Sequence, residues 1–210
     1  MSAIISRDLG RRPLRAVWEQ MQRFTDERGS DTPDEVWFVE HDPVFTLGLN
    51  ADDDHVLDPG EIEVVNIDRG GQVTYHGPGQ LVAYVLFDLR RIHLSIRPLV
   101  ELLENAVIET VAQYGVDAAS RRDAPGVYVD GAKLAAIGLR VRRGCSYHGL
   151  ALNIDMDLSP FSRINPCGMQ GLTVTQLREL NVGHSVRQVR DDLLRQLEAA
   201  VAAHLVEEDS

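Results

Sequence analysis

Residues 127–154, VYVDGAKLAAIGLRVRRGCSYHGLALNI, decide the fold class. Two β-rich runs, residues 127–129 and 134–141, flank Asp130-Gly131, a dipeptide typical of a tight hairpin turn. Residues 147–154 predict a further strand. A hairpin followed by another strand differs from the regular βαβ alternation of parallel sheets. The stretch therefore predicts an α+β fold with a mixed, largely antiparallel sheet flanked by helices.

The flanking sequence supplies the other elements of this fold. Helices are predicted from Pro13 to about residue 28, after Pro98 until Gly115, and from Ser185 onward, where Gln188 completes a capping box. Residues 172–180 also predict a helix, after an irregular stretch over 157–171. Strands are expected at residues 35–40, 44–47, 63–67 and 80–87. No linker or repeat interrupts the chain, so a single domain over residues 1–210 is expected.

Composition narrows the class of protein. Of the 210 residues, 44% are hydrophobic and 25% are charged, as in ordinary globular domains. No run of about 18 apolar residues predicts a transmembrane helix, and residues 1–15 lack the apolar core of a secretion signal. We therefore expect a cytosolic protein. The net charge of −11 argues against general nucleic-acid binding. In a reducing compartment, Cys145 and Cys167 are expected to be free thiols.

Lys133 is the only lysine beside 20 arginines. An ammonium differs from a guanidinium because it can lose its proton near neutral pH. Strict alternation along residues 133–141 puts Lys133 on the same side as Ala135, Ile137 and Leu139, which predicts that its amine is buried. A lysine at the start of a strand can instead extend its head to solvent.

Residues 69–80, RGGQVTYHGPGQ, form a glycine-rich segment between two predicted strands. Glycines allow a backbone to approach a ligand closely and to present N–H groups to it. The segment matches neither a phosphate-binding loop nor a dinucleotide fingerprint. Its alternative reading is a tight connection that buries Tyr75 and His76.

Cys167 lies between Pro166 and Gly168 in the predicted irregular stretch. A structural cysteine normally occupies an apolar, periodic element, whereas a constrained loop can present its thiol to a partner. The thiolate is the nucleophilic form, and a nearby cation such as Lys133 increases its population. His148 is a strand histidine, for which a structural hydrogen-bonded role is common. No paired-ligand spacing is present, so no metal site is expected.

Together these segments resemble the lipoyl(octanoyl) transferase family. The similar pieces are residues 69–80, 131–138, 147–153 with 155–158, and 163–168 followed by 173–177. The resemblance implies the fold of biotin and lipoate protein ligases. It also implies transfer of octanoyl or lipoyl from acyl carrier protein to a lysine of lipoyl domains or of the glycine cleavage H protein, with no cofactor. Neither nucleic acid nor membrane is expected as a partner.

By position, the resemblance makes Cys167 the acyl-thioester nucleophile and Lys133 the group that lowers its pKa. His148 and His76 are expected to orient reacting groups, and backbone N–H groups near Gly138 or Gly168 to stabilise an oxyanion. The implied substrate-binding residues are Arg69, Gly70, Gly71, Gln72, Val73, Thr74, Tyr75, His76, Ala136, Ile137, Gly138, Gly149, Leu150 and Ala151.

Three other functions compete with this interpretation. An ATP-dependent lipoate ligase shares the fold but needs no loop nucleophile. A Cys–His protease or amidotransferase would need a supporting Asn or Asp motif, and none is evident. An acyl-binding module would tolerate replacement of Cys167. Acidic protein partners require a basic patch on this acidic chain, for which Arg140, Arg142 and Arg143, then Arg90 and Arg91, are the candidates.

Overall fold

The computed structural model describes residues 4–169 and 171–208, except for the side chains of Cys167, Glu207 and Glu208. Its main sheet has seven strands in the order β1-β2-β6-β10-β9-β8-β7. Only the β1–β2 pair is parallel, and every other pair in this sheet is antiparallel. The strand bounds are β1 Ile5–Arg12, β2 Glu35–His41, β6 Gln80–Leu86, β7 Ala119–Ser120, β8 Gly126–Val129, β9 Ala132–Arg142 and β10 Cys145–Asn153.

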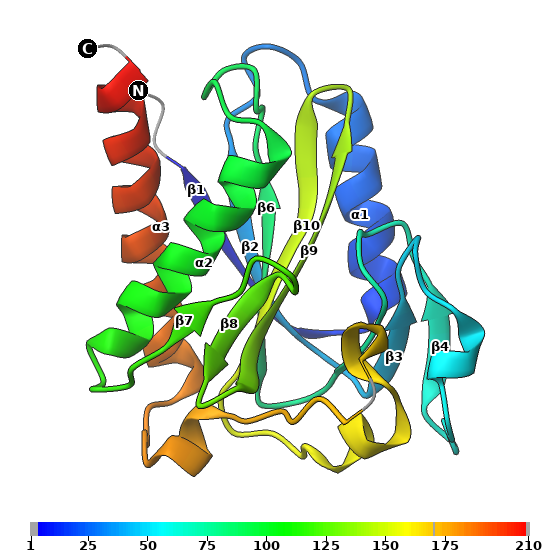
Figure 1. Cartoon of the computed structure of the whole chain (residues 1–210). Coiled ribbons are helices and arrows are strands. Elements are labelled where there is room, and N and C mark those ends of the chain that lie inside the picture. The colour runs from blue at the N-terminus through cyan, green and yellow to red at the C-terminus, as the bar shows by residue number, and fades with distance from the viewer. Residues whose placement is uncertain (1–3, 170, 209–210) are drawn as a thin grey trace.

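A second, three-stranded sheet has the order β4-β3-β5, with β3 at Val44–Leu47, β4 at Glu63–Asn66 and β5 at Val73–His76. β3 is parallel to β4 and antiparallel to β5. In Figure 1 this sheet lies to the right of the main sheet, beside the 3₁₀ turns of the 159–168 region. Phe45, Tyr75 and Phe161 form part of the core that joins it to those turns.

Helices cover both faces of the main sheet because the central strands are apolar on both sides. Helices α2 (Ile96–Ala112) and α3 (Val186–Glu208) lie on one face, and α1 (Leu14–Glu27) lies on the other (Figure 1). Leu99, Leu103 and Leu193 belong to the larger core cluster. Val17 and Met21 of α1 belong to a separate cluster on the opposite face. The predicted α+β class and mixed, largely antiparallel sheet are confirmed.

Local signals placed several boundaries well. At the β8–β9 turn, Asp130 and Gly131 both have positive φ, 50° and 84°, as a two-residue hairpin turn of the primed type requires. At the start of α3, Ser185 N–H donates to Gln188 Oε1 at 2.9 Å, and Gln188 N–H donates to Ser185 Oγ at 3.3 Å. The predicted capping box is therefore present.

Other predictions of secondary structure were wrong. Residues 172–176 are not helical, because Val174 forms an isolated parallel bridge with Lys133 and only Leu177–Leu180 forms a 3₁₀ turn. The glycine-rich segment is not a loop throughout, because residues 73–76 form β5. The edge strand β1 and the short β7 were missed. Residues 159–168, expected to be irregular, contain the 3₁₀ turns Ser159–Arg163 and Pro166–Gly168.

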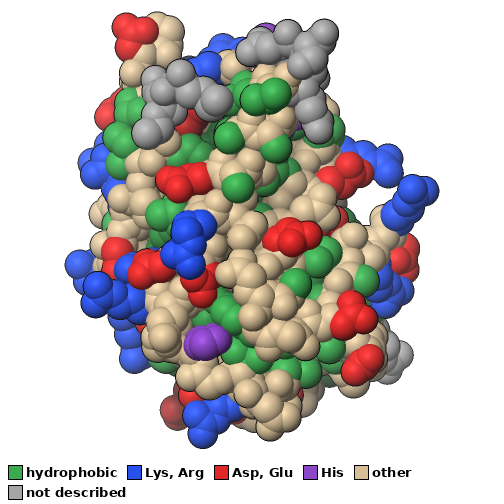
Figure 2. Space-filling model, turned by 90° about the vertical axis from the view of Figure 1, so that its left-hand side faces the viewer, with side chains coloured by type: hydrophobic (Ala, Val, Ile, Leu, Met, Phe, Trp, Pro, Cys, Tyr) green, Lys and Arg blue, Asp and Glu red, His purple; other side chains and the backbone are tan. Residues whose placement is uncertain are grey.

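The face that carries α3 shows acidic and basic side chains interspersed, with no large area of one sign in the view of Figure 2. Arg190 of α3 pairs with Asp8 of β1 and with Asp191, and Arg195 pairs with Asp192. Within the described part of the chain, no helix is long and apolar enough to cross a membrane.

Candidate active site

The glycine-rich segment and the β9–β10 pair form the walls of one pocket. Gly70 N–H donates to the Leu139 carbonyl at 2.9 Å, which fastens the segment onto β9. An added Cβ at Gly138 would lie 3.0 Å from the Gly70 carbonyl oxygen, so glycine at 138 permits this close approach. Gly138 and Gly149 are directly opposite each other in the β9–β10 ladder. Three predicted segments thus meet at one place.

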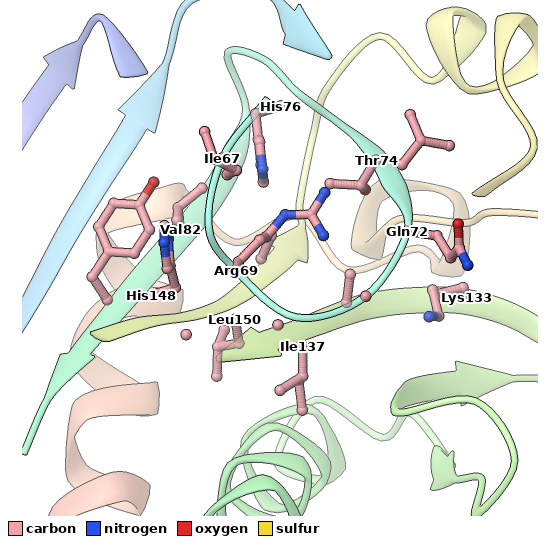
Figure 3. A pocket seen from close by; sticks show the side chains of 17 residues that line it. Ile67, Arg69, Gln72, Thr74, His76, Val82, Lys133, Ile137, His148 and Leu150 are labelled. Atoms are coloured by element: carbon pink, nitrogen blue, oxygen red, sulfur yellow. The ribbon is translucent and has the colours of Figure 1, made fainter. Parts of the chain in front are cut away.

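The pocket wall contains every predicted substrate-binding residue except Gly70 and Tyr75, together with Lys133 and His148. In Figure 3, Lys133 and Gln72 lie at one end of the pocket, Val82 and His148 lie at the other, and Arg69 lies between them. Much of the wall is apolar. It consists of Ile67, Arg69, Gly71, Gln72, Val73, Thr74, His76, Val82, Tyr84, Lys133, Ala136, Ile137, Gly138, His148, Gly149, Leu150 and Ala151.

Tyr75 has a structural position instead. Its ring packs against Phe45 and Phe161, with centroids 5.5 and 5.6 Å away. The alternation of β5 places Tyr75 on the opposite side from Thr74 and His76, which line the pocket. Ile67, Val82 and Tyr84, which the sequence did not single out, occupy the pocket wall.

Lys133 is buried, with 4% of its surface exposed, as predicted. The predicted face was wrong. In the β8–β9 pairing Tyr128 is opposite Lys133 and Val127 is opposite Ala135, so Leu134 is an extra residue in a β-bulge. Leu134 and Ala135 both join the main core, whereas Lys133 lines the pocket with Ala136. The bulge therefore changes which side of the sheet the amine faces.

The Lys133 amine has defined partners. Its Nζ donates to the Pro125 carbonyl at 3.0 Å and lies 5.2 Å from the centroid of the Tyr128 ring. A Cβ added at Gly126 would lie 3.2 Å from Nζ and 3.0 Å from Cε of this lysine. The backbone at residues 125–126 thus forms one side of the space that holds the amine.

Cys167 lies in the 3₁₀ turn Pro166–Gly168, and its side chain lies outside the described part of the structure. Pro166 and Lys133 line one small cavity together with Val174. The Lys133 N–H donates to the Thr173 carbonyl at 2.9 Å, and Thr175 N–H donates to the Lys133 carbonyl at 3.0 Å. The segment after the cysteine turn is therefore held directly against the lysine.

One predicted oxyanion donor is already engaged. Gly168 N–H donates to the Asn165 carbonyl at 3.0 Å within its own turn. A Cβ added at Gly168 would lie 3.1 Å from His55 Nε2 and 3.3 Å from Gln72 Cδ, so the turn packs against the glycine-rich segment. His55 was not identified from the sequence.

Arg69 lies inside the pocket with only 8% of its surface exposed. Its Nη2 donates to the carbonyl oxygen and to Oγ1 of Thr46, at 2.7 and 2.8 Å, and Nη1 donates to the Gly70 carbonyl at 3.0 Å. His76 Nδ1 lies 2.6 Å from Gln80 Oε1. Burial lowers the pKa of His76 to about 3, and the positive charge that a protonated His41 would carry is the second cause. His76 is therefore neutral at pH 7.

His148 is oriented by Asp68, a residue that the sequence did not identify. His148 has a positive φ of 61°, and its Nε2 donates to Asp68 Oδ1 at 2.9 Å. Trp18 Nε1 donates to the same carboxylate at 2.8 Å, and the Tyr147 hydroxyl also donates to it. Burial alone would raise the pKa of Asp68, but these hydrogen bonds outweigh it and hold the pKa below its usual range.

Burial, partly offset by Asp68, lowers the pKa of His148. The imidazole is therefore neutral at pH 7. Because Nε2 carries the proton that Asp68 accepts, Nδ1 is unprotonated and can only accept a hydrogen bond. The orienting role expected of His148 stays a prediction.

Structural similarity defines the class of this fold. At a TM-score of 0.78 and 16% identity, the structure resembles lipoate-protein ligase A bound with ATP, over 95% of this chain and 85% of that chain. It also resembles biotin protein ligase from Aquifex aeolicus, with a TM-score of 0.58 and 11% identity over 96% and 71% of the two chains. The lipoyl protein ligase A/B catalytic domain family matches residues 13–198. The fold is therefore that of the lipoate and biotin protein ligases.

Sequence similarity then selects one branch of this class. The chain is 60% identical to an octanoyltransferase of Alkalilimnicola ehrlichii over 196 residues, which cover 93% of this chain and 91% of that protein. The chain belongs to the octanoyltransferase family, within the group defined by the lipoyl protein ligase A/B catalytic domain. It is an acyltransferase of protein lipoylation.

Proposed function

We propose that the protein takes octanoyl from acyl carrier protein onto Cys167 and passes it to a specific lysine of a lipoyl domain or of the glycine cleavage H protein. The observation that carries this proposal is the position of Lys133. Its buried amine lies at one end of an apolar pocket and lines the same small cavity as Pro166, the neighbour of Cys167. A cation there favours the thiolate, and the pocket wall suits an alkyl chain.

The first half-reaction exchanges one thioester for another. The Cys167 thiolate attacks the carbonyl carbon of the octanoyl thioester, a new S–C bond forms, and the carrier thiolate leaves. Donor and product are both thioesters, so the exchange is nearly isoenergetic and needs no ATP.

The second half-reaction forms an amide. The amine of the acceptor lysine attacks the acyl-enzyme, the Cys167 thiolate leaves, and the amine gives up one proton. Lys133 stabilises the thiolate as an ammonium ion and, in its neutral form, accepts the proton from the amine. A guanidinium, which is always charged, could perform only the first task. The amide is more stable than the thioester, so this step is downhill.

We propose roles for the predicted substrate residues from their places in the pocket wall. Ala136, Ile137, Leu150 and Ala151 supply apolar wall for the octanoyl chain. Arg69 and the backbone of the glycine-rich segment supply polar groups to the same pocket. His148, held by Asp68, orients a polar group of the substrate through its Nδ1.

Acidic partners need a local basic surface on this chain. Of the predicted arginines, Arg90 pairs with Asp88 at 2.8 Å, Arg91 approaches Asp34 at 3.7 Å, and Arg142 pairs with Asp26 at 3.2 Å. Their charge is thus partly compensated. Arg140 is an exposed residue of β9, the strand that forms part of the pocket wall. We therefore choose Arg140 first for substitution in a carrier-docking assay.

Intact mass spectrometry tests the proposal. The protein is mixed with octanoyl-loaded carrier protein without ATP, beside Cys167→Ser and Lys133→Arg variants. We expect an added octanoyl mass that requires Cys167, passes to a lipoyl domain, and forms more slowly in Lys133→Arg. Transfer only with ATP and free octanoic acid would assign ligase chemistry instead. Full transfer by Lys133→Arg would disprove the proton-accepting role of Lys133.

A further inference from the structure

Glu104 is a buried carboxylate on α2, with 6% of its surface exposed. Burying a carboxylate is costly unless it is paired or hydrogen-bonded. Glu104 Oε1 accepts a hydrogen bond from the Gly126 N–H at 2.8 Å, across 22 residues of sequence. The carboxylate thereby fixes the peptide unit between Pro125 and Gly126 at the start of β8.

The same peptide unit holds the Lys133 amine. Its carbonyl, which belongs to Pro125, accepts from Lys133 Nζ at 3.0 Å. The two ends of one peptide group therefore connect the two buried side chains, with N–H pointing to Glu104 and C=O pointing to Lys133. Glycine at 126 leaves the room for this contact, because an added Cβ would lie 3.2 Å from Nζ.

We propose that Glu104 is a positioning residue for Lys133. It fixes the 125–126 peptide against which the amine rests, and its negative charge favours the ammonium form that stabilises the Cys167 thiolate. The inference rests on the proposed roles of Lys133 and Cys167 and adds a third residue to them. Glu104 contacts neither the pocket that receives the acyl chain nor, in the proposed mechanism, the reacting atoms.

The charged groups around Glu104 come from three elements. Glu101 and Arg97 on α2 pair with each other at 3.3 Å, and Arg121 and Arg122 lie on the segment before β8. Arg121 pairs with Asp123 at 2.7 Å. Lys133, on β9, is bonded to the opposite end of the 125–126 peptide.

Burial, with a smaller contribution from Glu101, raises the pKa of Glu104, whereas the Gly126 N–H and Lys133 act in the opposite direction. The charge of Lys133 thus acts on Glu104, as expected for two side chains that hold the two ends of one peptide group.

The test is the pH dependence of thiol alkylation by iodoacetamide in the full-length protein, resolved by peptide mass spectrometry. Cys145, which is buried and whose pKa burial raises, serves as the internal reference. Glu104→Gln keeps an oxygen that can accept from Gly126 but removes the charge. We expect its Cys167 profile to shift to higher pH, with about tenfold slower alkylation below the midpoint and an unchanged rate at high pH.

Two further variants separate charge from shape. Glu101→Gln removes an exposed charge one helical turn away and should leave the profile of the wild-type protein unchanged. Glu104→Asp keeps the charge but withdraws the carboxylate from the Gly126 N–H, so its midpoint should shift in the same direction as that of Glu104→Gln, but by less. A Glu104→Gln profile that coincides with the wild-type profile, or that is lowered equally at every pH, would overturn the inference.

Folding failure of the amide variant is covered by the aspartate variant, because an unshifted Glu104→Asp profile contradicts the fixing of the 125–126 peptide by Glu104. The outcome is also separable from the proposed function. Absence of a Cys167-dependent octanoyl adduct in the wild-type protein refutes the proposed function. An adduct combined with an unshifted Glu104→Gln profile refutes only the role of Glu104.

Discussion

Replacing Gly126 by alanine should disable the enzyme more than it destabilises the fold. Gly126 has φ of +139°, a conformation that residues with a Cβ rarely adopt. Its added Cβ would lie 2.5 Å from the Ala135 carbonyl oxygen, a contact that β8 and β9 can relieve only by moving apart. It would also lie 3.2 Å from Lys133 Nζ, so the movement displaces the amine.

Two magnitudes follow from this geometry. Backbone strain and a forced contact in a packed sheet cost about 1–3 kcal/mol of folding free energy. The catalytic effect is larger, because a displacement of about 1 Å at a reacting group can reduce the rate by about 100-fold. A loss of stability alone would not slow acylation at temperatures where the variant is folded.

Gly131→Ala is the matched control. Gly131 lies in the turn of the same hairpin and also has positive φ, +84°, but no atom lies within 4 Å of its added Cβ. Both variants are expected to have lower melting temperatures. Only Gly126→Ala should acylate Cys167 about 100-fold more slowly in a single-turnover assay with octanoyl-carrier protein. Equal acylation rates for the two folded variants would refute the assignment of the 125–126 backbone as the support of Lys133.

Three further predictions concern stability. Asp68→Asn should lower the free energy of unfolding by about 2 kcal/mol, because His148 loses a charged hydrogen-bond acceptor. Asp58→Asn, at the surface, should have little effect. Thermal unfolding of the two variants tests this difference. Because the pKa of His76 is lowered to about 3 in the folded protein, the imidazole takes up a proton at a higher pH in the unfolded state than in the folded state. The free energy of unfolding should therefore fall as the pH is lowered from 6.5 toward 3. His76→Gln should make this fall less steep, as measured by urea titrations at several pH values. An equal pH dependence in the two proteins would contradict the buried neutral imidazole. Gly149→Ala places a Cβ 2.0 Å from a carbonyl oxygen of β6 and should impair folding, whereas Gly183→Ala, with open space around it, should not; circular dichroism of the two variants distinguishes these outcomes.

Features that depend on neighbouring residues in sequence could be predicted. The Asp130-Gly131 turn and the Ser185 capping box each involve residues within three positions of each other, so their geometry depends on the local sequence. The apolar central strands followed from their composition. β1 could not be recognised, because its eight residues are almost all exposed and it exists through backbone pairing with β2. Residues 172–176 looked helical, but their backbone pairs with Lys133 instead.

The candidate site likewise combines features that the local sequence predicts with features that depend on distant residues. The pocket segments were recognised because each contains glycines or a distinctive polar residue, and these segments do meet in the structure. Asp68 and Glu104 were missed because each acts through a partner far away in sequence, His148 and Gly126. Nothing in the composition of α2 marks Glu104, since an acidic residue on an amphipathic helix is usually solvated.

Lys133 shows why a correct expectation can have an incorrect reason. Its burial was inferred from alternation with Ala135 and Ile137, but the bulge at Leu134 breaks that alternation. Without the extra residue, Lys133 would share the side of Ala135, which belongs to the main hydrophobic core. Burying an ammonium among these apolar side chains would be costly. The bulge instead directs the amine to the pocket and to the Pro125 carbonyl. One extra residue in the sheet thus keeps the lysine out of the hydrophobic core, where its charge would be destabilising, and places it where it can act on a neighbouring thiol.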